Sequence, residues 1–177
     1  MGFSTIVATG VSVLILLVVG YFLLMGFSGS INNLTATMKD VESMKGDQMK
    51  TSIAVSNIST SGHNVTFEMD NNGYTKITDF SKIEVIITFN QTMPDQYSSW
   101  VQKTDWFPYQ KNLTGTENAW TCVTIVPDMI DPGVLDPGEK MYASMYVQDD
   151  LVPGSLGWVV VMTPNGASSM GYFRVKI

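Results

Sequence analysis

Residues 6–27 form an unbroken apolar stretch, IVATGVSVLILLVVGYFLLMGF, and the first charged side chain of the sequence is Lys39. At about 1.5 Å of rise per residue, this stretch makes a helix of about 33 Å, enough to cross a hydrocarbon core of about 30 Å. A helix is required because backbone N–H and C=O groups find no other hydrogen-bonding partners in lipid. The sequence therefore predicts a membrane-spanning helix near the N-terminus.

A cleaved secretory signal is the alternative for the same stretch. Such a signal has a basic start, an apolar core of about 7–15 residues and an exit of small residues. Here residues 1–5 contain no Lys or Arg, the apolar run is longer, and GFSGSINN follows it. A retained helix is favoured, and whether a leader preceded Met1 stays open.

The helical pattern continues beyond the apolar stretch. Apolar residues recur three or four positions apart and share one face of a helix, with charged residues outside that face. The members of this stripe are Ile31, Leu34, Met38, Val41 and Met44. The stripe can pack on the chain's own globular domain or on neighbouring copies. Gly46 and Asp47 are predicted to end the helix.

Residues 1–50 are thus expected to be a helix and stalk, and residues 51–177 have the length of one domain. The charges of the stalk balance, so the net charge of −6 lies on the domain, where seven basic residues face thirteen acidic ones. An acidic surface of this kind repels nucleic acid and anionic lipid headgroups. A nucleic-acid partner is not expected.

From Ile53 onward, the spacing of apolar residues changes from helical to alternating, as in half-buried antiparallel strands. Strands are predicted at residues 52–59, 63–70, 83–89, 99–103, 120–126, 140–148, 157–163 and 170–177. In the fifth of these, Trp120, Cys122 and Thr124 are expected on one face, and Val123 and Ile125 on the other. Turn signals separate the strands, as Asn71-Asn72-Gly73 does. The predicted fold class is α+β, a long hydrophobic N-terminal helix followed by an immunoglobulin-like antiparallel β-sandwich.

Residues suited to catalysis are sparse. His63 is the only histidine, at a predicted turn, and Cys122 is the only cysteine, in an apolar strand where a buried, unreactive thiol is expected. The sequence contains no phosphate-binding, dinucleotide-binding or hydrolase motif. It predicts neither an enzyme nor a cofactor. An ectoenzyme or lectin, using the aromatic residues between Trp100 and Tyr109, is the competing hypothesis; capping of the core is the other role for them.

One loop gathers carboxylates around two Asp-Pro-Gly turns. Asp128, Asp131, Asp136 and Glu139 offer oxygen ligands, but their spacing departs from that of known calcium loops, and Asp before Pro-Gly is common in turns. No metal site is predicted, and calcium stays an open alternative.

Five N-x-[ST] sequences all lie C-terminal to the apolar stretch. They begin at Asn33, Asn57, Asn64, Asn90 and Asn112. Together they favour an outward-facing, glycosylated domain, because this sequence is the acceptor for N-linked glycans.

The architecture resembles that of archaeal type IV pilin-like proteins. The opening Met1-Gly2-Phe3-Ser4 before an apolar helix, and the turns at Asn72-Gly73 and Asp136-Pro137-Gly138-Glu139, are similar to those of archaellum proteins. Thr5 stands where bacterial pilins typically have glutamate, as expected for archaeal relatives.

The resemblance implies a structural subunit of a surface filament, inserted in the membrane before assembly and then polymerised through its helix. It implies a helix core made of Ile6, Val7, Val11, Leu14, Ile15, Leu17, Val18, Tyr21, Phe22 and Leu24. The implied partners are further copies, related filament subunits or a surface-layer protein, in motility or adhesion. The alternative is a membrane-anchored accessory or stator protein that binds the cell envelope through its sandwich.

Overall fold

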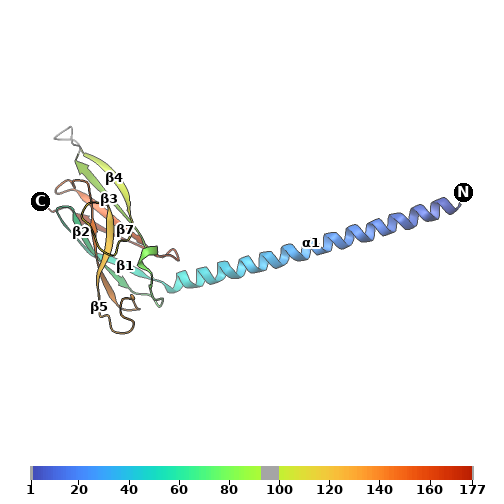
Figure 1. Ribbon diagram of the computed structural model, residues 1–177, viewed down its shortest axis with the longest axis horizontal. Coiled ribbons are helices and arrows are strands. Elements are labelled where there is room, and N and C mark those ends of the chain that lie inside the picture. The colour runs from blue at the N-terminus through green and yellow to red at the C-terminus, as the bar shows by residue number, and fades with distance from the viewer. Residues whose placement is uncertain (1, 93–99, 177) are drawn as a thin grey trace. The chain divides into compact units, whose positions relative to one another are not determined.

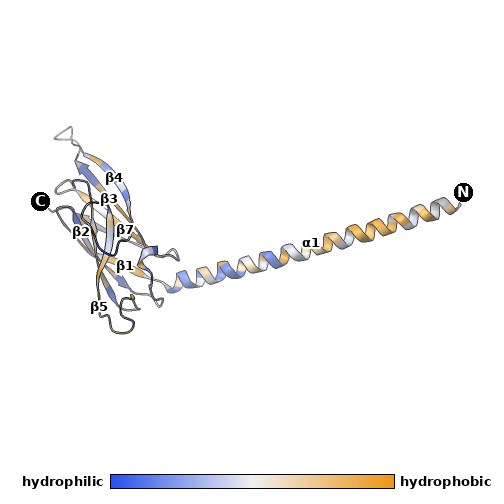
Figure 2. Ribbon diagram, viewed as in Figure 1, coloured by the Kyte–Doolittle hydropathy of each residue, from blue (hydrophilic) through white to orange (hydrophobic). Residues whose placement is uncertain are grey.

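The computed structural model describes residues 2–92 and 100–176, without the side chains of residues 4–6. Its first element is a single helix, α1, at Gly2–Lys50 (Figure 1). Figure 2 shows hydrophobic residues dominating the N-terminal part of α1 and a mixture of residue types in its C-terminal part. The chain contains no proline before Pro94, so the i to i−4 hydrogen bonds of α1 run without interruption.

The predicted end of this helix at Gly46 and Asp47 is wrong, because α1 continues to Lys50. A glycine inside a helix costs only about 1 kcal/mol relative to alanine. The last turn of α1 makes hydrogen bonds to two turns of the following domain, described below, and these offset that cost.

The second part of the chain is a sandwich of two antiparallel four-stranded sheets, as predicted. One sheet has the order β1-β2-β6-β5 and the other β4-β3-β7-β8. The strands are β1 (Ile53–Ser61), β2 (Asn64–Asn71), β3 (Glu84–Thr92), β4 (Trp100–Phe107), β5 (Ala119–Val126), β6 (Lys140–Tyr146), β7 (Leu156–Met162) and β8 (Ser168–Arg174). A short 3-10 helix, η1 (Phe80–Lys82), precedes β3 and was not predicted.

Alternate residues of the strands fill the space between the two sheets. The largest fully buried side chains are Trp120, Phe67, Phe89 and Phe107, with Trp120 against Tyr109 at 5.0 Å between ring centroids. Every described residue of this core lies between Ile53 and Val175. The sandwich therefore has a complete hydrophobic core that owes nothing to α1.

Two irregularities set which side chains face this core. In β1, the pairing with β2 shifts between Ser56 and Ser59, where Asn57 has a φ of 49°. In β5, the pairing with β6 shifts between Cys122 and Thr124. Because a bulge reverses the alternation after it, Ile125 is buried on the same side as Trp120. The predicted placements of Ile125 opposite Trp120 and of Thr124 on the side of Trp120 are both wrong for this reason, since Thr124 is exposed.

Candidate functional site

The surface of α1 is the first candidate for assembly. Nine of the ten residues assigned to a helix core are exposed, by 48% at Val18 to 71% at Leu24, and the side chain of Ile6 lies outside the described residues. The segment Val7–Lys50 contains a window long and apolar enough to cross a membrane, and none of that window is buried within the chain. Apolar side chains all around a helix require cover from lipid or from other helices.

Two serine hydroxyls of α1 form hydrogen bonds within the helix. Ser12 donates to the carbonyl of Ala8 at 2.9 Å, and Ser30 donates to that of Gly26 at 3.0 Å. A hydroxyl bonded back to residue i−4 makes no demand on its surroundings. Ser12 is therefore compatible with hydrocarbon or with a dry contact between helices.

The apolar stripe of the stalk is also exposed. Its five residues, Ile31, Leu34, Met38, Val41 and Met44, are between 49% and 67% exposed. The charged residues that flank the stripe make this segment amphipathic, in contrast with the uniformly apolar segment before it. One face of the stalk is thus suited to a helical partner.

The last turn of α1 belongs structurally to the sandwich, which forms a compact unit at Lys45–Ile177. Gln48 Nε2 donates to the carbonyl of Gly166 at 3.1 Å, and Asn165 Nδ2 donates to the carbonyl of Asp47 at 3.2 Å. Asn165 also donates to Thr51 Oγ1 at 2.5 Å. The Asp47 carbonyl at the end of α1 is therefore capped by the turn between β7 and β8.

A second turn completes this junction. The Tyr74 N–H donates to the Lys50 carbonyl at 2.7 Å, and the Asn72 N–H donates to the Ser52 carbonyl at 2.8 Å. A Cβ on Gly73 would lie 2.4 Å from Ser52 N. The Asn72-Gly73 motif thus allows the close approach of two backbones. Both turns can be predicted from the sequence. Their contact with the helix end cannot, because Gln48 and Gly166 lie 118 residues apart.

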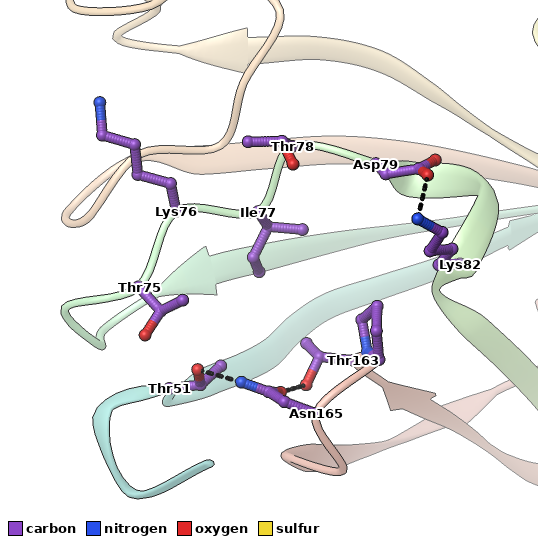
Figure 3. A pocket seen from close by; sticks show the side chains of 10 residues that line it. Thr51, Thr75, Lys76, Ile77, Thr78, Asp79, Lys82, Thr163 and Asn165 are labelled. Atoms are coloured by element: carbon purple, nitrogen blue, oxygen red, sulfur yellow. Dashed lines mark hydrogen bonds and ion pairs between the residues drawn. The ribbon is translucent and has the colours of Figure 1, made fainter. Parts of the chain in front are cut away.

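A cavity of about 250 Å³ lies beside this junction (Figure 3). The Thr51–Asn165–Thr163 hydrogen bonds lie at one end of it, and the ion pair between Lys82 and Asp79, at 3.0 Å, at the other. Lys76 pairs with Asp131 and Asp136. The lining contains no His or Cys, and both of its ammonium groups are paired. The cavity offers neither a nucleophile with a base nor a free cation.

Three carboxylates of the acidic loop accept hydrogen bonds from N–H groups of the loop, and Asp131 and Asp136 pair with Lys76 outside it. Both oxygens of Asp128 accept from the Gly133 N–H, at 3.1 and 3.2 Å, and Glu139 accepts from the Asp136 N–H at 3.0 Å. Asp136 is fully buried, with one oxygen 3.0 Å from Lys76 Nζ. Among residues 2–92 and 100–176, no group of three or more His, Cys, Asp or Glu has the arrangement of a metal site. The hydrogen bonds support a role for these acids in forming the turns. No observation on the described residues supports calcium binding.

The five glycosylation sequences have different surroundings. Asn33 lies exposed on α1, Asn64 exposed at the start of β2, and Asn112 exposed before β5. Asn57 is exposed in the β1 bulge, where its Nδ2 donates to Glu68 at 2.9 Å. Asn90 is half-buried in β3, and its Oδ1 atom is buried. The acceptor amides therefore differ in access.

The remaining candidates for chemistry have structural roles. His63 Nδ1 lies 2.9 Å from the Val147 carbonyl and Nε2 lies 3.6 Å from Asp150. Cys122 is half-buried, and burial raises the pKa of its thiol to about 11. A thiol with a raised pKa is a poor nucleophile at neutral pH.

The aromatic residues between Trp100 and Tyr109 fall into two groups, one that caps the core and one that is exposed. Phe107 is buried, and Tyr109 packs against Trp120, so these two residues cap the core. Trp100 and Trp106 are 60% and 58% exposed. These two side chains are available to a partner.

No protein-family model and no curated protein matches the sequence. Solved structures do share its fold. The archaellum periplasmic stator protein FlaG from Sulfolobus acidocaldarius is similar with a TM-score of 0.50 and 19% identity, over 70% of this chain and 99% of that one. A chain of the archaellum periplasmic stator protein complex of FlaF and FlaG from Sulfolobus acidocaldarius is also similar, with a TM-score of 0.50 and 19% identity. The similarity covers 70% of this chain and 89% of that one.

The archaeal flagellum of Methanospirillum hungatei strain JF1 is similar over 99% of this chain and 94% of that one, with a TM-score of 0.52 and 13% identity. The predicted likeness to archaellum proteins is confirmed at the level of fold. The chain has the fold that archaellum proteins show in a stator component and in the flagellum itself.

Proposed function

We propose that this chain is a structural subunit of an archaeal surface filament, of the archaellum or type IV pilus kind, and that it polymerises through α1. The observation that carries the proposal is the uncovered apolar surface of a helix 49 residues long. The similarity to the flagellum chain extends over 99% of the present chain and therefore includes α1. The stator chains resemble 70% of it.

The physical basis is an exchange of surroundings. In the membrane, lipid covers the apolar residues of α1; in a filament, the same residues of neighbouring copies cover one another. Small residues such as Gly10 and Gly20 permit close approach of helix backbones, which favours association where lipid and leucine are equally apolar. The sandwich of residues 51–177 then lies outside the helical core, at the cell surface.

A second function is supported by the sandwich. Its fold corresponds to 99% of the FlaG chain, at a higher identity than the flagellum chain shows. In this reading the protein is an anchored archaellum accessory: α1 stays in the membrane, and the sandwich binds the cell envelope, such as a surface-layer protein.

The two functions are separated by where the chain is found. Filaments sheared from cells that make the protein are imaged with an antibody against the sandwich, and their subunits are identified by mass spectrometry. A filament subunit labels along the whole filament and is among its main proteins. If the filaments lack this chain while it remains in the membrane fraction, the filament proposal is wrong.

The accessory function predicts a different result. The soluble unit Lys45–Ile177 would then retain surface-layer protein from envelope extracts, and cells lacking the chain would still build filaments. Filaments that disappear with the chain, together with no retention of envelope protein, would exclude it.

A further inference from the structure

The outer face of the β4-β3-β7-β8 sheet carries a group of apolar side chains that extends over all four strands. Its outward side chains include Ile86 on β3, Trp106 on β4, Leu156, Trp158, Val160 and Met162 on β7, and Met170 and Tyr172 on β8. These eight residues are called the apolar sheet face. Trp106 is 58% exposed and Tyr172 is 68% exposed.

The strand register places these side chains in rows across the sheet. Trp106 pairs with Ile86, Ile86 pairs with Val160, and Val160 pairs with Met170. In the next row, Trp158 pairs with Tyr172, and their ring centroids are 6.4 Å apart. The apolar sheet face is therefore continuous across all four strands.

The outer face of the other sheet is different. On β2 the outward residues are Asn64, Thr66, Glu68 and Asp70, and Lys140 on β6 pairs with Glu68 at 2.6 Å. Polar residues on the outward positions are what an antiparallel sheet facing water requires. Two glycosylation sequences, at Asn57 and Asn64, also belong to this sheet. Asn90 holds an outward position on β3, but its Oδ1 atom is buried, so glycans at Asn57 and Asn64 would leave the apolar sheet face as the side free for contact with protein.

Charge indicates which partner fits the apolar sheet face. On the described outward positions of its four strands, the only charged residues are Glu84 and Arg174. The face is thus neutral, whereas the domain as a whole carries the net charge of −6. Two copies repel each other through most of their surfaces, and least through this one.

The positions of the two charges favour a second copy in a defined orientation. Glu84 lies in the row of Met162, at one end of the sheet, and Arg174 lies in the row of Leu156, at the other end. Because Glu84 is on β3 and Arg174 is on β8, two strands away, a second copy that is turned end for end and crosses the first obliquely brings its Arg174 over Glu84 of the first. Self-association then pairs an acid with a base twice.

The size of the face agrees with a weak contact between copies. The whole outer side of the sheet, with four strands about 4.8 Å apart and about seven residues long, covers roughly 450 Å², and the apolar sheet face is part of it. Two such faces together bury about 900 Å², close to the lower limit of about 1,000 Å² for specific interfaces. The contact would be weak for isolated domains and would add to contacts made by α1.

We propose that the apolar sheet face binds the same face of a second copy, turned end for end and crossing obliquely, so that Glu84 of each copy meets Arg174 of the other. This contact goes beyond the proposed function, because it uses no residue of α1 and applies to a filament subunit and to an anchored accessory alike.

The test uses the unit Lys45–Ile177, whose hydrophobic core is complete without the rest of α1. Sedimentation from micromolar to near-millimolar concentrations is expected to show a reversible monomer–dimer equilibrium. Tyr172→Arg and, separately, Trp106→Arg should each weaken the dimer about tenfold or more, because each places a charge in an apolar contact. Tyr74→Arg is the matched control, since Tyr74 is 87% exposed in a different part of the sandwich.

A charge exchange tests the orientation. Glu84→Arg and Arg174→Glu should each weaken the dimer, and the double variant should restore it. Circular dichroism confirms that each variant is folded. The proposal is overturned if the wild-type unit stays monomeric, if the Tyr74 control weakens the dimer as much as Tyr172→Arg, or if the double charge variant is no better than the single ones. If the unit stays monomeric and floats together with neutral lipid vesicles, the apolar sheet face binds a lipid surface and the proposal is also overturned.

Discussion

The side chain of Gln48, in the last turn of α1, donates a hydrogen bond of 3.1 Å to the carbonyl of Gly166, in the turn between β7 and β8. Asn165 in the same turn donates to the Asp47 carbonyl. The end of the helix is thereby attached to the β4-β3-β7-β8 sheet, although the chain leaves the helix directly into β1 of the other sheet.

Removing these side-chain bonds should loosen the helix end without unfolding the sandwich. Gln48→Ala and Asn165→Ala are each expected to cost about 1 kcal/mol, the usual net value of a hydrogen bond. Amide hydrogen exchange at Thr51 should become faster in both variants, while exchange in β2 and β6 stays slow. Unchanged exchange at Thr51 in the double variant would show that the backbone bonds alone hold the junction.

A methyl group at Gly73 should damage the fold more than one at Gly46. A Cβ on Gly73 would lie 2.4 Å from Ser52 N and 2.6 Å from the Lys50 carbonyl oxygen, and both atoms are backbone. Gly73→Ala is therefore expected to lower the free energy of unfolding by about 2 kcal/mol or more. Gly46→Ala is the control, because nothing lies within 4 Å of a Cβ there, and helix propensity predicts no loss. Thermal unfolding of Lys45–Ile177 measures both, and equal melting temperatures would contradict the close approach.

The carboxylate of Glu68 should stabilise the sandwich at neutral pH and lose that effect in acid. A hydrogen bond from Lys140, and then one from Asn57, holds the pKa of Glu68 below its ordinary value. A carboxyl group with a lowered pKa in the folded state contributes stability above its unfolded pKa, and the contribution is lost as the pH falls through the folded pKa.

The measurement is the melting temperature of the wild type and of Glu68→Gln between neutral and acidic pH. Wild type should melt higher at pH 7, and the difference should shrink as the pH falls below the ordinary range of glutamate. Glu117→Gln, at an exposed position, controls for the loss of one negative charge. A difference that is constant with pH would contradict the assignment.

Glycan occupancy should follow the access of the acceptor amides. Asn64 and Asn112 are exposed, so glycans attach there without disturbing the folded sandwich. Asn90 has a buried Oδ1 in β3, so it is expected to stay unmodified on the folded domain. Mass spectrometry of peptides from the native protein measures this. A glycan on Asn90 would require modification before folding.

The sequence sufficed for the features that depend on local patterns. An uncharged run of the length of a membrane predicts α1, and alternation of apolar residues predicts the buried faces of strands such as β6, where Met141, Ala143 and Met145 are all buried. The turn at Pro164-Asn165-Gly166 was visible as a cluster of turn-forming residues. Each of these signals lies within a few neighbouring positions.

The features that could not be predicted from the sequence depend on contacts between segments that are distant along the chain. The helix end at Lys50 is set by the turns around Gly73 and Gly166, and local signals pointed to Gly46 instead. Ile125 faces the core, contrary to the prediction, because of a bulge in β5 that no single residue type in the sequence indicates. The apolar sheet face required the strand order, since Trp106 and Met170 come from the two edge strands β4 and β8.

The bonds at the end of α1 determine where a mechanical load enters the sandwich. Tension along the chain reaches β1, an edge strand, which would peel from β2 one residue pair at a time. The Lys50–Tyr74 and Ser52–Asn72 backbone bonds must break before that peeling starts, and Gln48 and Asn165 pass part of the force to the other sheet. A domain built this way resists pulling at an edge strand because the force is distributed over both sheets.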